Sequence, residues 1–183
     1  MFSIILLSRL FAQSLSCSPK NEVCFTPTIN KTTVNIAMKF KPLKSQYIAI
    51  GFGSKEGMAG AEIISFTKTT KYMVTSYYAS DNARPTIIPD KWQISNVVET
   101  PSQVTLMVSR SVAATGGKSK LFPSDGGTFI WSTGTSAHGE LTEHQPGNNG
   151  QITVKMTPET GVKYKAASSH FLFNPFFLVV FLF

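Results

Sequence analysis

Apolar and polar residues alternate along several short stretches of this chain, and that period of two restricts the fold more than any other feature. In the stretch Thr33–Phe40 every second residue is apolar, as in an extended strand with one buried face. Further runs rich in β-branched and aromatic residues are 47–52, 62–67, 71–79, 92–98, 103–110, 128–133 and 151–156. Gly, Pro, Asn and Asp fill the gaps between the runs, as expected for turns.

No stretch repeats apolar residues at the spacing of an exposed amphipathic helix, so nothing supports crossovers between parallel strands. The sequence therefore predicts an all-β protein, an antiparallel immunoglobulin-like β-sandwich of about eight to eleven strands. Ligand sites in that class lie in the loops at one end. A length of 183 residues fits one domain, and 42% apolar with 15% charged residues fits a globular chain. We expect the domain to span residues 17–160.

The N-terminus is predicted to be a secretory signal peptide covering residues 1–16. An apolar run ends in the small residues Ala12, Ser14 and Ser16, at signal-peptidase spacing, although Arg9 interrupts it. An N-terminal core strand or a short membrane anchor is the alternative.

The C-terminal segment 161–183 ends in the apolar run Phe171–Phe183, which is shorter than the ~20 residues of a membrane-spanning helix. Small residues, Ala166 to Ser169, precede this run, a pattern typical of a glycosylphosphatidylinositol (GPI) anchor signal. The polar spacer between them is shorter than usual, and a buried tail is the alternative. Both ends together predict a secreted protein on the outer face of the plasma membrane, attached through a lipid anchor.

Secretion gives meaning to two features near the mature N-terminus. Cys17 and Cys24 are the only cysteines, and in an oxidising compartment they are expected to form a small disulfide loop. Asn30-Lys31-Thr32 is a sequon that makes Asn30 a candidate glycosylation site.

The formal net charge of +7 comes from scattered lysines and not from a basic stripe, so nucleic acid is not an expected partner. Acidic proteins or cell-surface polyanions would suit such a surface, and so would a plain solvated exterior. No nucleophile elbow, zinc-protease helix, phosphate-binding loop or paired carboxylates are found in the sequence. We therefore expect no catalytic residues and a protein without a substrate site of its own.

Several segments, taken in order, resemble the DOMON family. Tyr47–Gly53 followed by Gly57-Met58-Ala59-Gly60 resembles the strand, turn and methionine of these domains. The later landmarks agree in order, and the resemblance covers about residues 25 to 156. They are Tyr77-Tyr78 before Pro85, the run Val104–Arg110, and Phe129–Gly134 leading to the loop with His144.

This resemblance implies a β-sandwich that, in some members, carries b-type haem between a methionine and a histidine. In this sequence the two axial ligands of the haem iron would be Met58 and His144, with His138 as the alternative histidine. Such a pair fills both axial positions and suits one-electron transfer, with a redox partner protein or a small-molecule electron donor or acceptor. No cofactor other than haem b is expected.

Three further residues are candidates for the haem site. Trp131 and Tyr78 could pack on the porphyrin, although large aromatic residues on strands are more often core. Arg110 could pair with a haem propionate, or it could be a solvated strand end. Met58 could itself be a core residue.

Other members of the family bind no haem, so two alternatives stay open. One is a haem-free module that binds a carbohydrate or a protein on the same sandwich. The other is a structural coat or adhesion protein.

Overall fold

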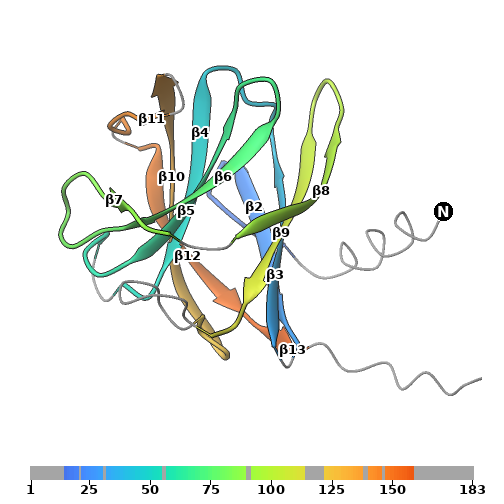
Figure 1. The fold of residues 1–183 in the computed structure, drawn as a ribbon, viewed down its shortest axis with the longest axis vertical. Coiled ribbons are helices and arrows are strands. Elements are labelled where there is room, and N and C mark those ends of the chain that lie inside the picture. Colours follow the sequence, from blue (N-terminus) through green and yellow to red (C-terminus); the bar gives the residue numbers. More distant parts are fainter. Residues whose placement is uncertain are drawn as a thin grey trace, which may run out of the picture.

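The computed structural model describes residues 15–20, 22–30, 32–54, 57–89, 92–113, 122–137, 140–145 and 147–158, and these residues form strands and no helix. The strands build two sheets that pack face to face (Figure 1). The predicted all-β sandwich is therefore confirmed. No helix within the described ranges is long and apolar enough to cross a membrane.

The first sheet has six strands, in the order β1-β2-β3-β9-β8, with β13 beside β2. The pairing of β13 with β2 is parallel, and the other pairings are antiparallel. The bounds are β1 Ser16–Cys17, β2 Val23–Ile29, β3 Thr33–Phe40, β8 Gln93–Glu99, β9 Val104–Ser111 and β13 Thr157–Pro158.

The second sheet has seven strands, in the order β11-β10-β4-β5-β6-β7, with β12 beside β10. All of its pairings are antiparallel. The bounds are β4 Gln46–Phe52, β5 Glu62–Lys68, β6 Tyr72–Tyr78, β7 Thr86–Ile87, β10 Gly126–Ala137, β11 Glu140–Leu141 and β12 Asn149–Lys155.

The facing sides of the two sheets enclose one apolar core. Alternation along the strands decides which residues enter it, as in β9, where the buried positions are Val104, Leu106, Val108 and Arg110. Phenylalanine rings fill the space between the sheets, and the rings of Phe52 and Phe122 lie 4.8 Å apart.

Arg110 is part of this core, which does not fit its predicted role as a partner of a haem propionate or as a solvated strand end. Its Nη1 lies 2.9 Å from Oε1 of Glu62 on β5, and both side chains are fully buried. The guanidinium also lies over the rings of Phe52 and Trp92, 5.4 and 5.0 Å from their centres. The period of two explains the position, since Arg110 shares its face with the apolar residues of β9.

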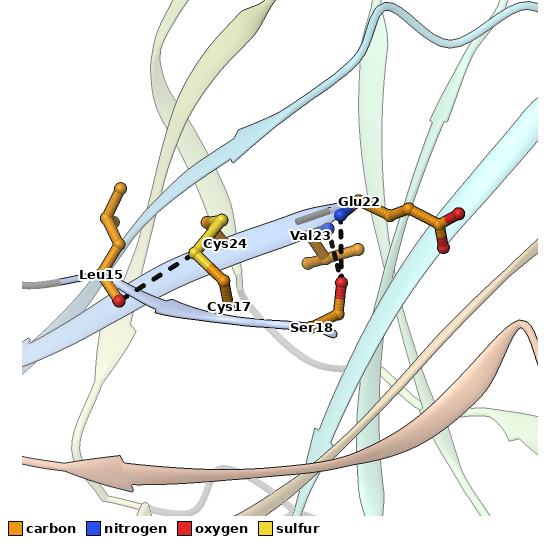
Figure 2. Close-up of a disulfide and its surroundings, with 6 residues drawn as sticks. All are labelled: Leu15, Cys17, Ser18, Glu22, Val23 and Cys24. Carbon is orange, nitrogen blue, oxygen red and sulfur yellow. Dashed lines mark hydrogen bonds between the residues drawn. A yellow bond between two sulfur atoms is a disulfide. The ribbon is translucent and has the colours of Figure 1, made fainter. Parts of the chain in front are cut away.

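The predicted disulfide between Cys17 and Cys24 is present and joins β1 to β2. Figure 2 shows how the short loop is closed on its other side by Ser18, whose Oγ accepts hydrogen bonds from the amides of Glu22 (3.0 Å) and Val23 (3.2 Å). The first strand is thus held to the sheet by a covalent bond and by the turn that follows it.

Other predictions near the ends concern residues that are not described. Most of the expected signal peptide, residues 1–14, and the expected anchor signal, residues 161–183, lie outside the described residues. Asn30 lies in the turn between β2 and β3, is exposed, and accepts hydrogen bonds from the amides of Thr32 and Thr33. Its glycosylation stays a prediction.

Candidate functional site

A pocket of about 360 Å³ opens on the outer face of the seven-stranded sheet, the face turned away from the core. Alternation sends Ile50 and Phe52 of β4 into the core, so Ala49 and Gly51 face outward. The register of the sheet brings residues of four strands together as the pocket floor: Ala49, Gly51, Ile63, Ile130, Ser132 and Gln151.

Gly51 lies at the centre of this floor, where only a glycine leaves enough space. A Cβ atom at this position would lie 2.8 Å from Cγ1 of Ile130 and 3.0 Å from Cγ1 of Ile63. Because Gly51 has no side chain, these two isoleucines approach each other over it. The floor is therefore apolar, and no side chain of residue 51 projects from its middle.

Met58 forms one wall of the pocket. It lies in the loop between β4 and β5 and packs partly against the outer-face cluster that includes Ile63 and Tyr77. The loop is attached to the segment after β6, because the amide of Gly60 donates to the carbonyl of Ala79 (2.7 Å). The amide of Ala79 in turn donates to the carbonyl of Ala61 (3.0 Å).

His144 forms another part of the wall, from the connection between β11 and β12. A turn in which the amide of Asn148 donates to the carbonyl of Gln145 (3.0 Å) closes this connection before β12 begins. Nε2 of His144 lies 3.3 Å from the side-chain amide of Asn149. Nδ1 of His144 is buried and has no hydrogen-bond partner among the described residues.

Comparison with solved structures finds a similar fold in two cytochrome domains. One is the cytochrome domain of cellobiose dehydrogenase from Myriococcum thermophilum, with a TM-score of 0.55, 12% identity, and 74% of each chain covered. The other is the cytochrome b domain of pyranose dehydrogenase from Coprinopsis cinerea, with a TM-score of 0.54, 12% identity, and coverage of 73% of this chain and 75% of that one. This chain has the fold of these two domains, which are DOMON-type domains.

The resemblance predicted from the sequence is thus confirmed at the level of the fold. Protein-family models and curated proteins give no match. At 12% identity the comparison shows the fold alone. The chemistry has to be argued from the residues of this chain.

The pocket brings together three of the predicted site residues, Met58, His144 and Trp131. Trp131 borders the pocket from the core side of the sheet, since its side chain belongs to the inner core and is 5% exposed. A Cβ atom on Gly150 would lie 2.9 Å from the indole Nε1, so the backbone of β12 packs directly on this ring.

Two other predicted residues do not line the pocket, and one is not described. Tyr78 pairs with Glu62, a residue of the inner face, whereas its neighbour Tyr77 pairs with Ile63 of the pocket floor. Arg110 is paired with Glu62 in the core. His138, the alternative histidine, lies outside the described residues.

Sequence reasoning missed Gly51, Asn82 and Asn149, all of which line the pocket. Gly51 stood in the stretch Tyr47–Gly53 that resembles a strand of the family, but its contact with Ile130 depends on strand pairing. Asn82 lies in a bend between β6 and β7, and Asn149 is the first residue of β12, next to the turn at Asn148. Asparagine is common in and beside turns for local reasons. No signal in the sequence separated them from ordinary turn residues.

The described lining contains no Asp, Glu, Lys or Arg, so the pocket is apolar with a few amide and hydroxyl groups. Beside it, burial raises the pKa of Tyr47, although a hydrogen bond with Ser132 acts in the opposite direction. Across the described part of the chain, no three His, Cys, Asp or Glu side chains gather as a metal site.

The same residues fit haem on three observations. The pocket volume falls within the ~300–1,000 Å³ of small-molecule sites, and its floor is apolar. A thioether and an imidazole, both suitable ligands for haem iron, line this one pocket. A ring nitrogen of the histidine is buried without a partner in the described structure, and such a group is normally satisfied by something.

Proposed function

We propose that this protein is a b-type cytochrome that transfers single electrons, with haem held between Met58 and His144. The observation that carries the proposal is that these two side chains, far apart in the sequence, line one apolar pocket. The fold shared with two cytochrome domains supports it. When bound, haem would supply an iron centre that changes oxidation state by one electron.

Each residue of the pocket would have a physical task in this function. Met58 would offer a soft, neutral sulfur, which favours the ferrous state, and His144 would offer a ring nitrogen. The floor of Ile63, Ile130 and Gly51 would exclude water from the ring. Because the lining carries no fixed charge in its described part, the pocket itself would favour the state of lower net charge.

The extracellular part of the proposal has separate support. The Cys17–Cys24 disulfide is a bond typical of secreted proteins and rare in reducing compartments. We place the protein on the outer face of the plasma membrane, held by a GPI anchor. There it would exchange electrons with a redox partner protein or a small molecule, and Asn30 would carry a glycan.

The test is to express the full chain in a secretory eukaryotic host with haem supplied, and to record oxidised and reduced visible spectra. We expect sharp α and β bands of a six-coordinate haem in the reduced protein. Met58→Ala and His144→Ala should each abolish that spectrum, because each removes one axial ligand. Met107→Ala, on β9 of the other sheet, is the matched control and should leave the spectrum intact.

Two results would contradict the proposal. A wild-type protein that folds but binds no haem would favour a haem-free module, and retention on a glycan array would then identify a carbohydrate binder. If His138→Ala and not His144→Ala abolished the spectrum, haem binding would stand and the assignment of the histidine would be wrong.

A further inference from the structure

The side chain of Asn82 holds the backbone of the methionine loop. Its Oδ1 accepts two hydrogen bonds, from the amide of Met58 at 2.9 Å and from the amide of Ala59 at 3.2 Å. Asn82 lies in the segment between β6 and β7, so these bonds add a side-chain link to the backbone bonds of Gly60 and Ala61 with Ala79, which attach the same loop. One oxygen thereby fixes two successive peptide groups at the residue that lines the pocket.

The residue before Met58 is adapted to this contact. Gly57 has a φ of +57°, and a Cβ atom there would lie 2.8 Å from Oδ1 of Asn82. Any other residue would push against the oxygen that accepts both hydrogen bonds. On the far side of the turn, the hydroxyl of Ser54 donates to the carbonyl of Gly57 at 2.7 Å. The loop is thus held on both sides of Gly57.

A thioether needs such support more than a charged ligand does. The sulfur of methionine is neutral and binds iron weakly. If the loop moved freely, the loss of its conformational entropy on binding would weaken the bond to iron further. Residues behind the ligands of a metal commonly supply the missing order, and their loss weakens ligation without removing a ligand. Asn82 holds the backbone of Met58 in this way.

We propose that Asn82 is a positioning residue that fixes the backbone of Met58 and so keeps its thioether available as an iron ligand. The inference rests on the proposed function, because it assigns a partner to one of the two ligands. It concerns residues of the pocket wall and needs no contact between Asn82 and the cofactor.

The experiment compares three full-length variants in haem-loaded protein. Asn82→Ala removes the acceptor, and we expect loss of the methionine-to-iron charge-transfer absorption and a reduction potential shifted down toward that of Met58→Ala. Asn82→Asp keeps an oxygen in place, so the absorption should be retained, while the added negative charge lowers the potential. Asn96→Ala, on β8 of the other sheet, should match the wild type in both measurements.

Gly57→Ala provides an independent route to the same effect. Its Cβ would displace Oδ1 of Asn82, so it should weaken the charge-transfer absorption as Asn82→Ala does. The double variant should then be no worse than the single Asn82→Ala, because both changes break the same bonds. Far-ultraviolet circular dichroism confirms that each variant is folded before it is compared.

Amide hydrogen exchange at Met58 and Ala59 in the haem-free protein separates this inference from the proposed function. In Asn82→Ala both amides should exchange on the order of tenfold faster or more, whereas Asn82→Asp should keep them protected. If the wild type binds no haem, the proposed function fails. If Met58 and Ala59 also exchange at the same rate in Asn82→Ala as in the wild type, the role of Asn82 in fixing this backbone is rejected too. If haem binds normally and Asn82→Ala keeps the absorption and the potential of the wild type, the positioning role is overturned while the cytochrome stands.

Discussion

Gly51 shows how one missing side chain shapes the pocket. Because a Cβ there would lie 2.8 Å from Ile130, Gly51→Ala should overpack the floor and cost about 1–3 kcal/mol of the free energy of unfolding. It should also weaken haem binding, since the displaced isoleucines would enter the pocket. Urea unfolding and haem titration measure the two effects.

A second substitution checks that the cause is steric. Ile130→Ala removes the atom in conflict, so the double variant with Gly51→Ala should be more stable than the sum of the two single effects predicts. Additive losses would mean that Gly51 acts through its backbone and not through the space above it.

Single residues also show what the sequence could and could not predict about the site. Met58 and His144 were predicted as site residues because each stands in a turn at a family landmark, and such landmarks can be found without knowledge of strand pairing. Tyr78 and Arg110 were assigned to the pocket, although they lie on the other face. A shift of one residue along a strand reverses the face, so these assignments needed the register of the sheet.

At the scale of elements, the ion pair between β5 and β9 ties the two sheets together inside the core. Removing one partner would leave a buried charge uncompensated, so Glu62→Gln should cost about 3–5 kcal/mol of unfolding free energy. The loss should appear in urea unfolding at neutral pH.

The control is an apolar replacement of the whole pair. The double variant Glu62→Leu with Arg110→Met leaves no buried charge, so it should be more stable than either single variant. It also removes the acceptor of the Trp92 indole N–H, 3.3 Å from Oε1 of Glu62, which limits its recovery. A double variant less stable than both singles would show that the pair is net stabilising.

The strands themselves were largely predictable, with one instructive omission. All eight runs predicted to be strands are strands, whereas β2, which has Pro27 in its middle, was not predicted. Proline cannot donate to a neighbouring strand, which argues against a central position. The structure accommodates it because β1 pairs with Cys24 and Phe25 and β13 with Thr28 and Ile29, so neither short strand pairs with Pro27.

The short strand β1 depends on the disulfide more than on its two paired residues. Replacing both Cys17 and Cys24 by Ser should lower the free energy of unfolding by roughly 2–3 kcal/mol, because a small loop is released in the unfolded chain. The haem spectrum should not change, since the bond lies in the sheet opposite the pocket. Reduction of the wild type should give the same loss, and an unchanged stability would show that the disulfide contributes nothing.

For the whole molecule, a polar link between side chains of β5, β6 and β8 joins the two sheets. Lys68 on β5 lies 2.6 Å from Oε2 of Glu99 on β8, and the hydroxyl of Tyr72 on β6 donates to Oε1 of Glu99 at 3.1 Å. The hydrogen bond from Lys68 lowers the pKa of Glu99. Burial, together with the hydrogen bond to Glu99, raises the pKa of Tyr72 to about 12.

The raised pKa of Tyr72 makes the sandwich sensitive to alkali. The folded protein keeps the phenol protonated to higher pH than the unfolded chain does, whose tyrosines ionise near pH 10.0. The stabilisation is therefore complete below that pH and is lost as the pH rises from 10.0 toward about 12. Urea unfolding across this window should show a falling free energy of unfolding. Tyr72→Phe should reduce the slope, leaving the part due to other buried tyrosines such as Tyr47, whose pKa is also raised. An equal slope in Tyr72→Phe would mean that the link between the sheets does not depend on this proton.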